Sequence, residues 1–370
     1  MIGHTIGVSL RQILRRPFLP IMNLVGLACG IAVTLIILLY AYVETHFDDW
    51  VTDQENLYRI EGQYKGSWSS YYHLYVVNAL GPAIADFPEV KNVVRLIGNH
   101  WLVKKDDFVN YDTVFLAEDG FLDIFPLQFV KGSTQSPFPT KNSVIISEAA
   151  ALQYWGQEDP VGQTLTLNEA YDFTVSAVFK EVGPRTDYPF KFVVPFQDVL
   201  VHEPNSWDVY DSETFVRLNA GASTESLYER IAQLVDEHRP LHKQTDHVMR
   251  ERFHYFLQPF ADLHLGSQGR TEANTIGNYA KIYGFIAIAG LVLMISVFNY
   301  IGLATARDLE REREFCLRKI SGAGFRQILH HTVAESFLLT WLAAMLGWVI
   351  TEAVMPYVGA FLDADYSLLE

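Results

Sequence analysis

The chain has 370 residues, of which 49% are hydrophobic, and its formal net charge is -15. Residues 44–303 carry this whole charge, because the charges of the segments on either side cancel. The acidic balance argues against a nucleic-acid partner, since binding to phosphates needs a basic surface. Two cysteines, Cys29 and Cys316, are too few for a disulfide framework or a metal site.

Residues 1–18 have an amphipathic pattern. Apolar and basic side chains alternate at helical spacing, with Ile2, Ile6, Leu10, Ile13 and Leu14 beside Arg11, Arg15 and Arg16. We expect an amphipathic helix in the inner membrane interface. The alternative is a plain positively charged flank of the segment that follows.

Residues 19–43 contain no charged side chain and are long enough to cross a bilayer. A signal peptide would have a shorter apolar region and a small-residue cleavage site, so an uncleaved first span is predicted. The preceding arginines place the N-terminus in the cytoplasm. Gly26 and Gly30 form a small-xxx-small pair, which allows another helix to approach closely.

Residues 44–280 are predicted to form an external domain of mixed α and β structure. Strand-like runs alternate with helical patterns, the runs being Leu57–Glu61, Val93–Ile97, Val114–Ala117, Ser143–Ile146, Phe173–Phe179 and Thr214–Leu218. Turn-rich breaks on either side suggest an inserted subdomain at 141–209.

The sequence predicts where two helices of this domain begin, and where one of them ends. Ser147 is a candidate N-cap for a short helix that Gly156 would stop. Thr224 is predicted to start a second helix with an apolar face.

A second span is predicted at 281–306, followed by a charged cytoplasmic segment at 307–334. Six Lys or Arg residues lie between Arg307 and Arg326, and basic residues favour the cytoplasmic side. A third span is predicted at 335–357, with the tail 358–370 outside. The centres of the spans hold no ionisable side chain, which disfavours a solute channel through these helices.

Motifs for catalysis, cofactors or metals are absent from the sequence. There is no G-x-x-x-x-G-K-[ST] loop for ATP and no H-E-x-x-H metal motif. The pairs Asp48-Asp49 and Asp106-Asp107 are interpreted as solvated turns. We therefore expect no catalytic, cofactor-binding or metal-binding residues in this chain.

Several blocks of sequence resemble the MacB/FtsX-like family of ABC-transporter permeases over essentially the full length. They include LYRIEG from Leu57, SVIISEAAALQYWGQEDPVGQTLTL from Ser143 and LQPFADLHLGS from Leu257. The most specific block follows Asn299, where Glu314, Arg318, Gly322, Ala323 and Glu335 match the family's E-x-G-x-R-x-x-x-G-A…E-[AS] run. Cys316 stands where that run has its first Gly.

The resemblance implies that the cytoplasmic segment docks on a separate ATP-binding subunit. The residues that it assigns to this coupling are Glu314, Arg318, Lys319, Gly322 and Ala323. The family pattern also has a fourth span, and the chain ends before it. We therefore expect the first half of a longer permease.

The resulting hypothesis is a non-catalytic ABC-permease subunit of a bacterial inner membrane. It would act as a homodimer or pseudo-dimer with a cytoplasmic ATPase, which binds the ATP, and with a periplasmic or outer-membrane partner. The alternative is a membrane-anchored sensor or scaffold whose external domain binds a ligand. An envelope enzyme would need a convergent polar pocket, for which the sequence offers no candidate.

Overall fold

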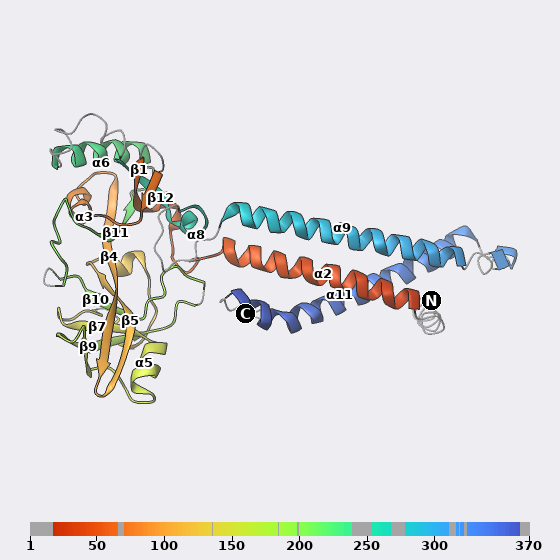
Figure 1. Ribbon diagram of the computed structural model, residues 1–370, viewed down its shortest axis with the longest axis horizontal. Helices are drawn as coiled ribbons and strands as arrows, with labels where there is room; N and C mark the ends of the chain where they lie inside the picture. Colours follow the sequence, from red (N-terminus) through yellow and green to blue (C-terminus); the bar gives the residue numbers. More distant parts are fainter. Residues whose placement is uncertain are drawn as a thin grey trace. The chain divides into compact units, whose positions relative to one another are not determined.

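The chain folds into two compact units (Figure 1). One comprises residues 1–45 and 278–370, here called the helical unit, and the other comprises residues 46–277, here called the α+β domain. The computed structural model describes residues 18–65, 70–134, 136–183, 185–197, 200–238, 253–267, 278–310, 316–317, 319–321 and 324–362. The predicted amphipathic helix at 1–18 lies almost wholly outside these residues.

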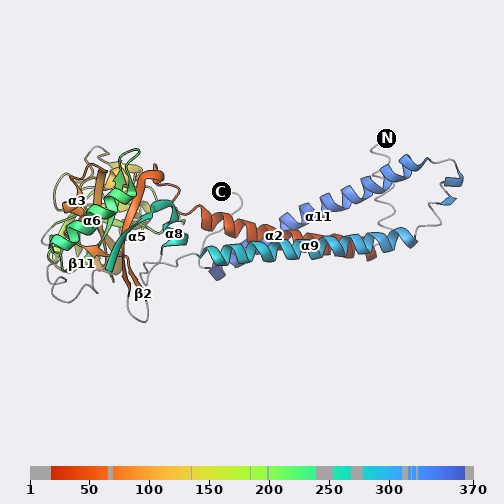
Figure 2. The same cartoon turned by 90° about the horizontal axis from the view of Figure 1, so that it is seen from above.

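The helical unit contains the long helices α2 (Phe18–Thr45), α9 (Tyr279–Glu310) and α11 (Phe325–Leu362). Within the described residues, three stretches are long and apolar enough to cross a membrane: Phe18–Thr45, Tyr279–Arg307 and Ile328–Gly359. Helix α2 packs against both other helices, and Figure 2 shows it beside α9.

Small residues bring these helices together. Leu27 and Ala28 of α2 form a buried cluster with Ala343 of α11. A Cβ at Gly347 of α11 would lie 3.0 Å from the carbonyl oxygen of Ala28, so the two backbones approach closely. In a membrane such close van der Waals packing is a main source of helix association.

Helices α9 and α11 extend beyond the apolar runs of the sequence. Helix α9 continues through the charged residues to Glu310, because Arg and Glu are good helix formers. Helix α11 begins at Phe325, ten residues before the predicted span, and continues past Pro356 to Leu362.

The α+β domain is built on a twelve-stranded mixed sheet with the strand order β12-β1-β11-β4-β5-β10-β7-β9-β6, while β2, β3 and β8 pair with members of that path. Its elements in chain order are η1 (Gln54–Asn56), β1 (Leu57–Lys65), β2 (Ser70–His73), β3 (Val76–Val77), α3 (Leu80–Ile84), β4 (Val90–Lys105), β5 (Phe108–Ala117), α4 (Phe121–Ile124), β6 (Phe129–Gly132), β7 (Ser143–Ser147), α5 (Glu148–Trp155), β8 (Thr164–Leu167), β9 (Tyr171–Phe179), β10 (Phe192–Pro195), β11 (Tyr210–Leu218), α6 (Thr224–His238), β12 (Phe253–Pro259), η2 (Phe260–Asp262) and α8 (Leu263–Gly266).

The predicted fold class is confirmed, and each strand-like run of the sequence lies in a strand. The two helix ends are confirmed as well. The Ser147 side chain accepts a hydrogen bond from the Ala150 N–H, and Gly156 follows the last turn of α5 with a φ of 61°. Helix α6 begins at Thr224 and buries Leu227 and Ile231.

Residues 141–209 contribute the helix α5 and the strands β7, β8, β9 and β10, of which β8, β10 and β9 pair with β4, β5 and β6 in the same sheet. Their status as an inserted subdomain stays a prediction.

Candidate functional site

A buried arginine on β1 is the centre of an unusual polar network in the α+β domain. Arg59 is 3% exposed and Glu61 is fully buried. Because side chains alternate along a strand, residues 59 and 61 share one face of the sheet. The Arg59 Nη2 donates to Glu61 Oε1 at 2.5 Å, and Nε donates to the same oxygen at 3.1 Å.

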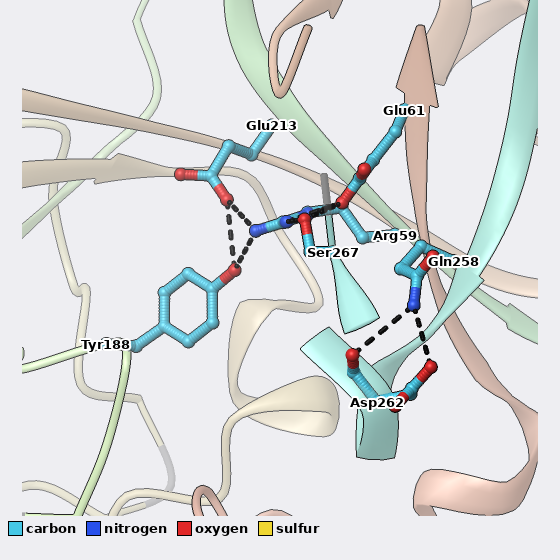
Figure 3. Close-up of polar contacts among 7 residues, drawn as sticks. All are labelled: Arg59, Glu61, Tyr188, Glu213, Gln258, Asp262 and Ser267. Atoms are coloured by element: carbon cyan, nitrogen blue, oxygen red, sulfur yellow. Dashed lines mark hydrogen bonds and ion pairs between the residues drawn. The ribbon is translucent and has the colours of Figure 1, made fainter. Parts of the chain in front are cut away.

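Arg59 also contacts a second carboxylate and a tyrosine (Figure 3). Its Nη1 lies 3.2 Å from Glu213 Oε2 on β11 and 2.8 Å from the Tyr188 hydroxyl, which itself donates to Glu213 at 3.0 Å. Burial raises the pKa of Glu213, although Arg59 opposes the shift. Burial alone would lower the pKa of Arg59, but Tyr188 and the two glutamates raise it above its ordinary value.

The network also includes the segment through which the chain leaves the domain, residues 260–267, here called the outgoing segment. The Ser267 hydroxyl donates to Glu61 Oε1 at 2.7 Å and accepts from Arg59 Nη2 at 2.9 Å. We call Arg59, Glu61, Tyr188, Glu213 and Ser267 the Arg59 network. It connects two strands and a loop of the domain to the outgoing segment.

The segment through which the chain enters the domain, residues 46–50, is here called the incoming segment. Asp48 in this segment is 4% exposed, so its interpretation as a solvated turn was wrong. Its carboxylate accepts hydrogen bonds from Trp50 Nε1 and the Asp187 N–H, each at 3.2 Å, and from the Thr186 hydroxyl. Burial, followed by repulsion from Asp187, raises the pKa of Asp48 to about 6.

The incoming and outgoing segments contact each other directly. The rings of Phe47 and His264 are stacked, with centroids 3.6 Å apart and an interplanar angle of 7°. His264 Nδ1 lies 3.1 Å from Asp187 Oδ1, and Asp187 is also bonded to Asp48 through its N–H. The two ends of the domain are therefore joined to each other and to the loop that carries Tyr188.

An aromatic cluster anchors both segments to the core. Phe125 is fully buried and lies at its centre. Its ring centroid is 5.9 Å from Trp50 of the incoming segment and 6.0 Å from Phe260 of the outgoing segment. Each such aromatic pair adds roughly 0.5–1.5 kcal/mol beyond the burial of its area. The apolar core and the polar contacts thus hold the same two segments.

This arrangement joins the two ends of the domain to the strands β1 and β11. The charged groups of the Arg59 network are buried and paired with one another. Among the residues that the structure describes, no group of three or more His, Cys, Asp or Glu side chains is placed to hold a metal ion. A buried pair is costly to break, because removing one partner leaves an uncompensated charge.

Of the predicted coupling residues, Glu314, Arg318, Gly322 and Ala323 lie outside the described residues. Lys319 is described, in a helical turn with its side chain exposed. Gly26 and Gly30 lie against α9, where a Cβ at Gly30 would overlap Ser296 and a Cβ at Gly26 would lie 3.2 Å from Asn299 Nδ2.

The sequence reasoning missed the Arg59 network. A signal for it is present in β1, where Arg59 and Glu61 occupy alternate positions of a strand with apolar neighbours. Charged residues on one face of a strand inside a domain suggest a buried pair, but its partners Tyr188, Glu213 and Ser267 are distant in the chain.

Two family models match the chain. The MacB-like periplasmic core domain matches residues 21–234, and the FtsX-like permease C-terminal region matches residues 286–368.

Two curated relatives are permeases by name. The pyoverdine export ATP-binding/permease protein PvdT of Pseudomonas syringae pv. syringae is 26% identical over 276 residues, which cover 72% of this chain and 39% of PvdT. The uncharacterized ABC transporter permease YvrN of Bacillus subtilis is 22% identical over 246 residues, which cover 65% of this chain and 56% of YvrN. The chain thus spans about half the length of the curated relatives it matches.

Two solved structures are similar to part of this chain. A domain of a putative permease protein from Porphyromonas gingivalis is 22% identical with a TM-score of 0.49, and it covers 57% of this chain and 92% of that chain. The periplasmic region of MacB from Actinobacillus actinomycetemcomitans is 11% identical with a TM-score of 0.41, covering 58% of this chain and 92% of that chain.

Proposed function

This chain belongs to the MacB/FtsX-like family of ABC-transporter permeases, and on that basis we propose that it transmits the ATP-driven movement of a separate subunit to its α+β domain. In this proposal the chain performs no chemistry itself. The ATPase binds and hydrolyses ATP in the cytoplasm, and the α+β domain acts on a substrate on the envelope side.

The observation that carries the proposal is the joining of the two segments that connect the α+β domain to the helices. The incoming segment continues directly from α2, and the outgoing segment leads towards α9. Phe47 and His264 stack on each other, and Ser267 binds the Arg59–Glu61 pair. A displacement of α2 would enter the incoming segment directly along the chain, and it would reach β1 and β11 through the contacts of that segment with the outgoing segment and with the loop that carries Tyr188.

The site for the ATPase is proposed to be the segment 307–334, with Glu314 and Arg318 as its central residues. The support is the match of these residues to the family's motif and the absence of a phosphate-binding loop in the sequence. A helix with alternating charges suits a polar protein surface.

The topology and the assembly complete the proposal. The N-terminus and the segment 307–334 lie in the cytoplasm, and the α+β domain lies in the periplasm. A second permease protomer or half pairs with the helical unit in the inner membrane, and a periplasmic or outer-membrane partner receives the substrate.

The test is isolation of the tagged chain from membranes in a mild detergent, with mass spectrometry of the proteins that accompany it. We expect a protein with a phosphate-binding loop, and we expect the variant Glu314→Gln/Arg318→Gln to lose it. The matched control, Lys281→Gln at the opposite end of α9, should retain it. Recovery of a kinase in place of an ATPase would contradict the proposal and would favour the alternative, a membrane-anchored sensor or scaffold.

A further inference from the structure

A cavity of about 400 Å³ lies beside the Arg59 network in the α+β domain. Its size is in the range of small-molecule sites in proteins. The lining includes His254, Phe256 and Gln258 of β12, which lie on one face of that strand because they alternate with Tyr255 and Leu257. The remaining lining includes Gln63 of β1, Tyr72 of β2 and Tyr228 of α6.

The register of the sheet connects this cavity to the Arg59 network. His254 pairs with Gln63, Phe256 with Glu61, and Gln258 with Arg59. Residues directly opposite on neighbouring strands share a face. The cavity and the network are therefore adjoining parts of one polar face of the sheet.

The walls of the cavity are rich in aromatic rings. Tyr72 and Phe256 are set at an angle of 90° with centroids 6.1 Å apart, so they bound two adjoining sides. The Gln63 amide donates to the Tyr72 hydroxyl at 2.8 Å and holds that ring in place. Tyr228 supplies further aromatic surface.

Carboxylates lie behind two of these walls, while Arg59 lies directly opposite a third lining residue, Gln258, and is paired with Glu61. Glu61 lies directly opposite Phe256. The Asp262 carboxylate lies behind the lining residue Gly266, so close that a Cβ there would overlap it, and it accepts from the Gln258 amide at 3.3 Å. Among the described residues that line the cavity there is no Lys or Arg to repel a cation.

We propose that this cavity is a binding site for a small organic cation of the quaternary-ammonium class. Aromatic faces attract such a cation through their ring quadrupoles, and the half-buried Asp262 carboxylate behind Gly266 adds to the attraction. An anionic ligand would meet the same Asp262 carboxylate and be repelled. The proposal concerns binding alone and is independent of the ATPase.

The test uses the full chain in detergent, without nucleotide, and measures binding of choline and of its neutral isostere 3,3-dimethylbutan-1-ol by saturation-transfer NMR. We expect choline to bind and the isostere to bind at least several-fold more weakly. Equal binding of the two compounds, or binding of neither, would overturn the proposal.

Variants assign the binding to the cavity. Phe256→Leu should weaken choline binding by roughly threefold to thirtyfold, the range expected for one cation–π contact. Phe256→Tyr keeps the ring and should bind as the original chain does. Phe108→Leu removes an exposed ring elsewhere in the domain and should have no effect. Choline binding that is unchanged in a folded Phe256→Leu variant would contradict the assignment to this cavity.

Discussion

Arg307, in the last turn of α9, forms an ion pair with Glu335 of α11, with 3.3 Å between Nη1 and Oε1. Both residues are buried, at 9% and 2% exposure. A second contact joins the same helices, since the Tyr300 hydroxyl donates to the Ser336 carbonyl at 3.3 Å. Two polar contacts therefore connect the end of α9 to α11, close to where the segment proposed as the ATPase site begins and ends.

Replacement of either partner of this pair should destabilise the helical unit. Arg307→Gln or Glu335→Gln breaks the ion pair and keeps the other charge buried, which costs about 3–5 kcal/mol. The double variant should cost less than the sum of the two, because no uncompensated charge remains. Thermal unfolding in detergent measures both effects. Lys281→Gln is the control for loss of a charge from α9, and strictly additive effects would contradict the pairing.

Because α2 packs closely on α9, we predict that position 30 tolerates only a small residue. Gly30→Leu places a large side chain where Ser296 lies, so we expect a severe loss of monodisperse protein on size-exclusion chromatography. Gly290→Leu is the matched control, since no atom lies within 4 Å of a Cβ at that position. Equal behaviour of the two variants would refute the packing of α2 on α9.

Removal of the central arginine should unfold part of the α+β domain. Arg59→Met removes the cation that Glu61 and Glu213 share, and we expect a loss of about 3–5 kcal/mol in the free energy of unfolding. Arg230→Met removes a half-exposed arginine of α6 and should cost under about 1 kcal/mol. Limited proteolysis and thermal unfolding distinguish the Arg59→Met variant from the Arg230→Met variant. An Arg59→Met domain that resists protease as the original chain does would show that the network is dispensable for stability.

The raised pKa of the buried Asp48 carboxyl predicts that the stability of the α+β domain depends on pH in the acidic range. Its pKa in the fold is about 6, above the ordinary value of 3.8, so the fold favours the protonated carboxyl. Protonated Asp48 therefore increases the free energy of unfolding. This stabilisation is fully present below pH 3.8 and is lost as pH rises through about 6. Its size is roughly 3 kcal/mol.

Asp48→Asn should therefore reduce the decline in stability between pH 4 and pH 7, as measured by denaturant unfolding at a series of pH values. Asp49→Asn, at the exposed neighbouring position, should leave the decline unchanged. An identical pH profile for Asp48→Asn and the original chain would rule out this carboxyl as the source.

Local patterns in the sequence predicted the local structure well. The N-cap at Ser147 and the stop at Gly156 depend on residues within one or two helical turns, and the structure confirms both. Uncharged runs of the sequence likewise predicted the positions of the three long helices. They did not predict where α9 and α11 end, because charged residues can continue a helix beyond its apolar part.

The network that joins the domain's two ends was not predicted, because its members meet only through the fold. Arg59 and Glu213 are separated by 154 residues, and Tyr188 reaches them from a loop. Asp48 was misread for the same reason. Two adjacent aspartates resemble a solvated turn unless Thr186 and Asp187 are known to lie beside them.

The central claim is that nucleotide in the ATPase moves the joined incoming and outgoing segments. The most direct test is hydrogen–deuterium exchange of the complex with and without a non-hydrolysable ATP analogue. We predict that amide exchange changes in residues 46–50 and 260–267, while the β4–β5 hairpin tip around residue 107 is unaffected. Exchange in the two segments that is the same in both states would contradict the account.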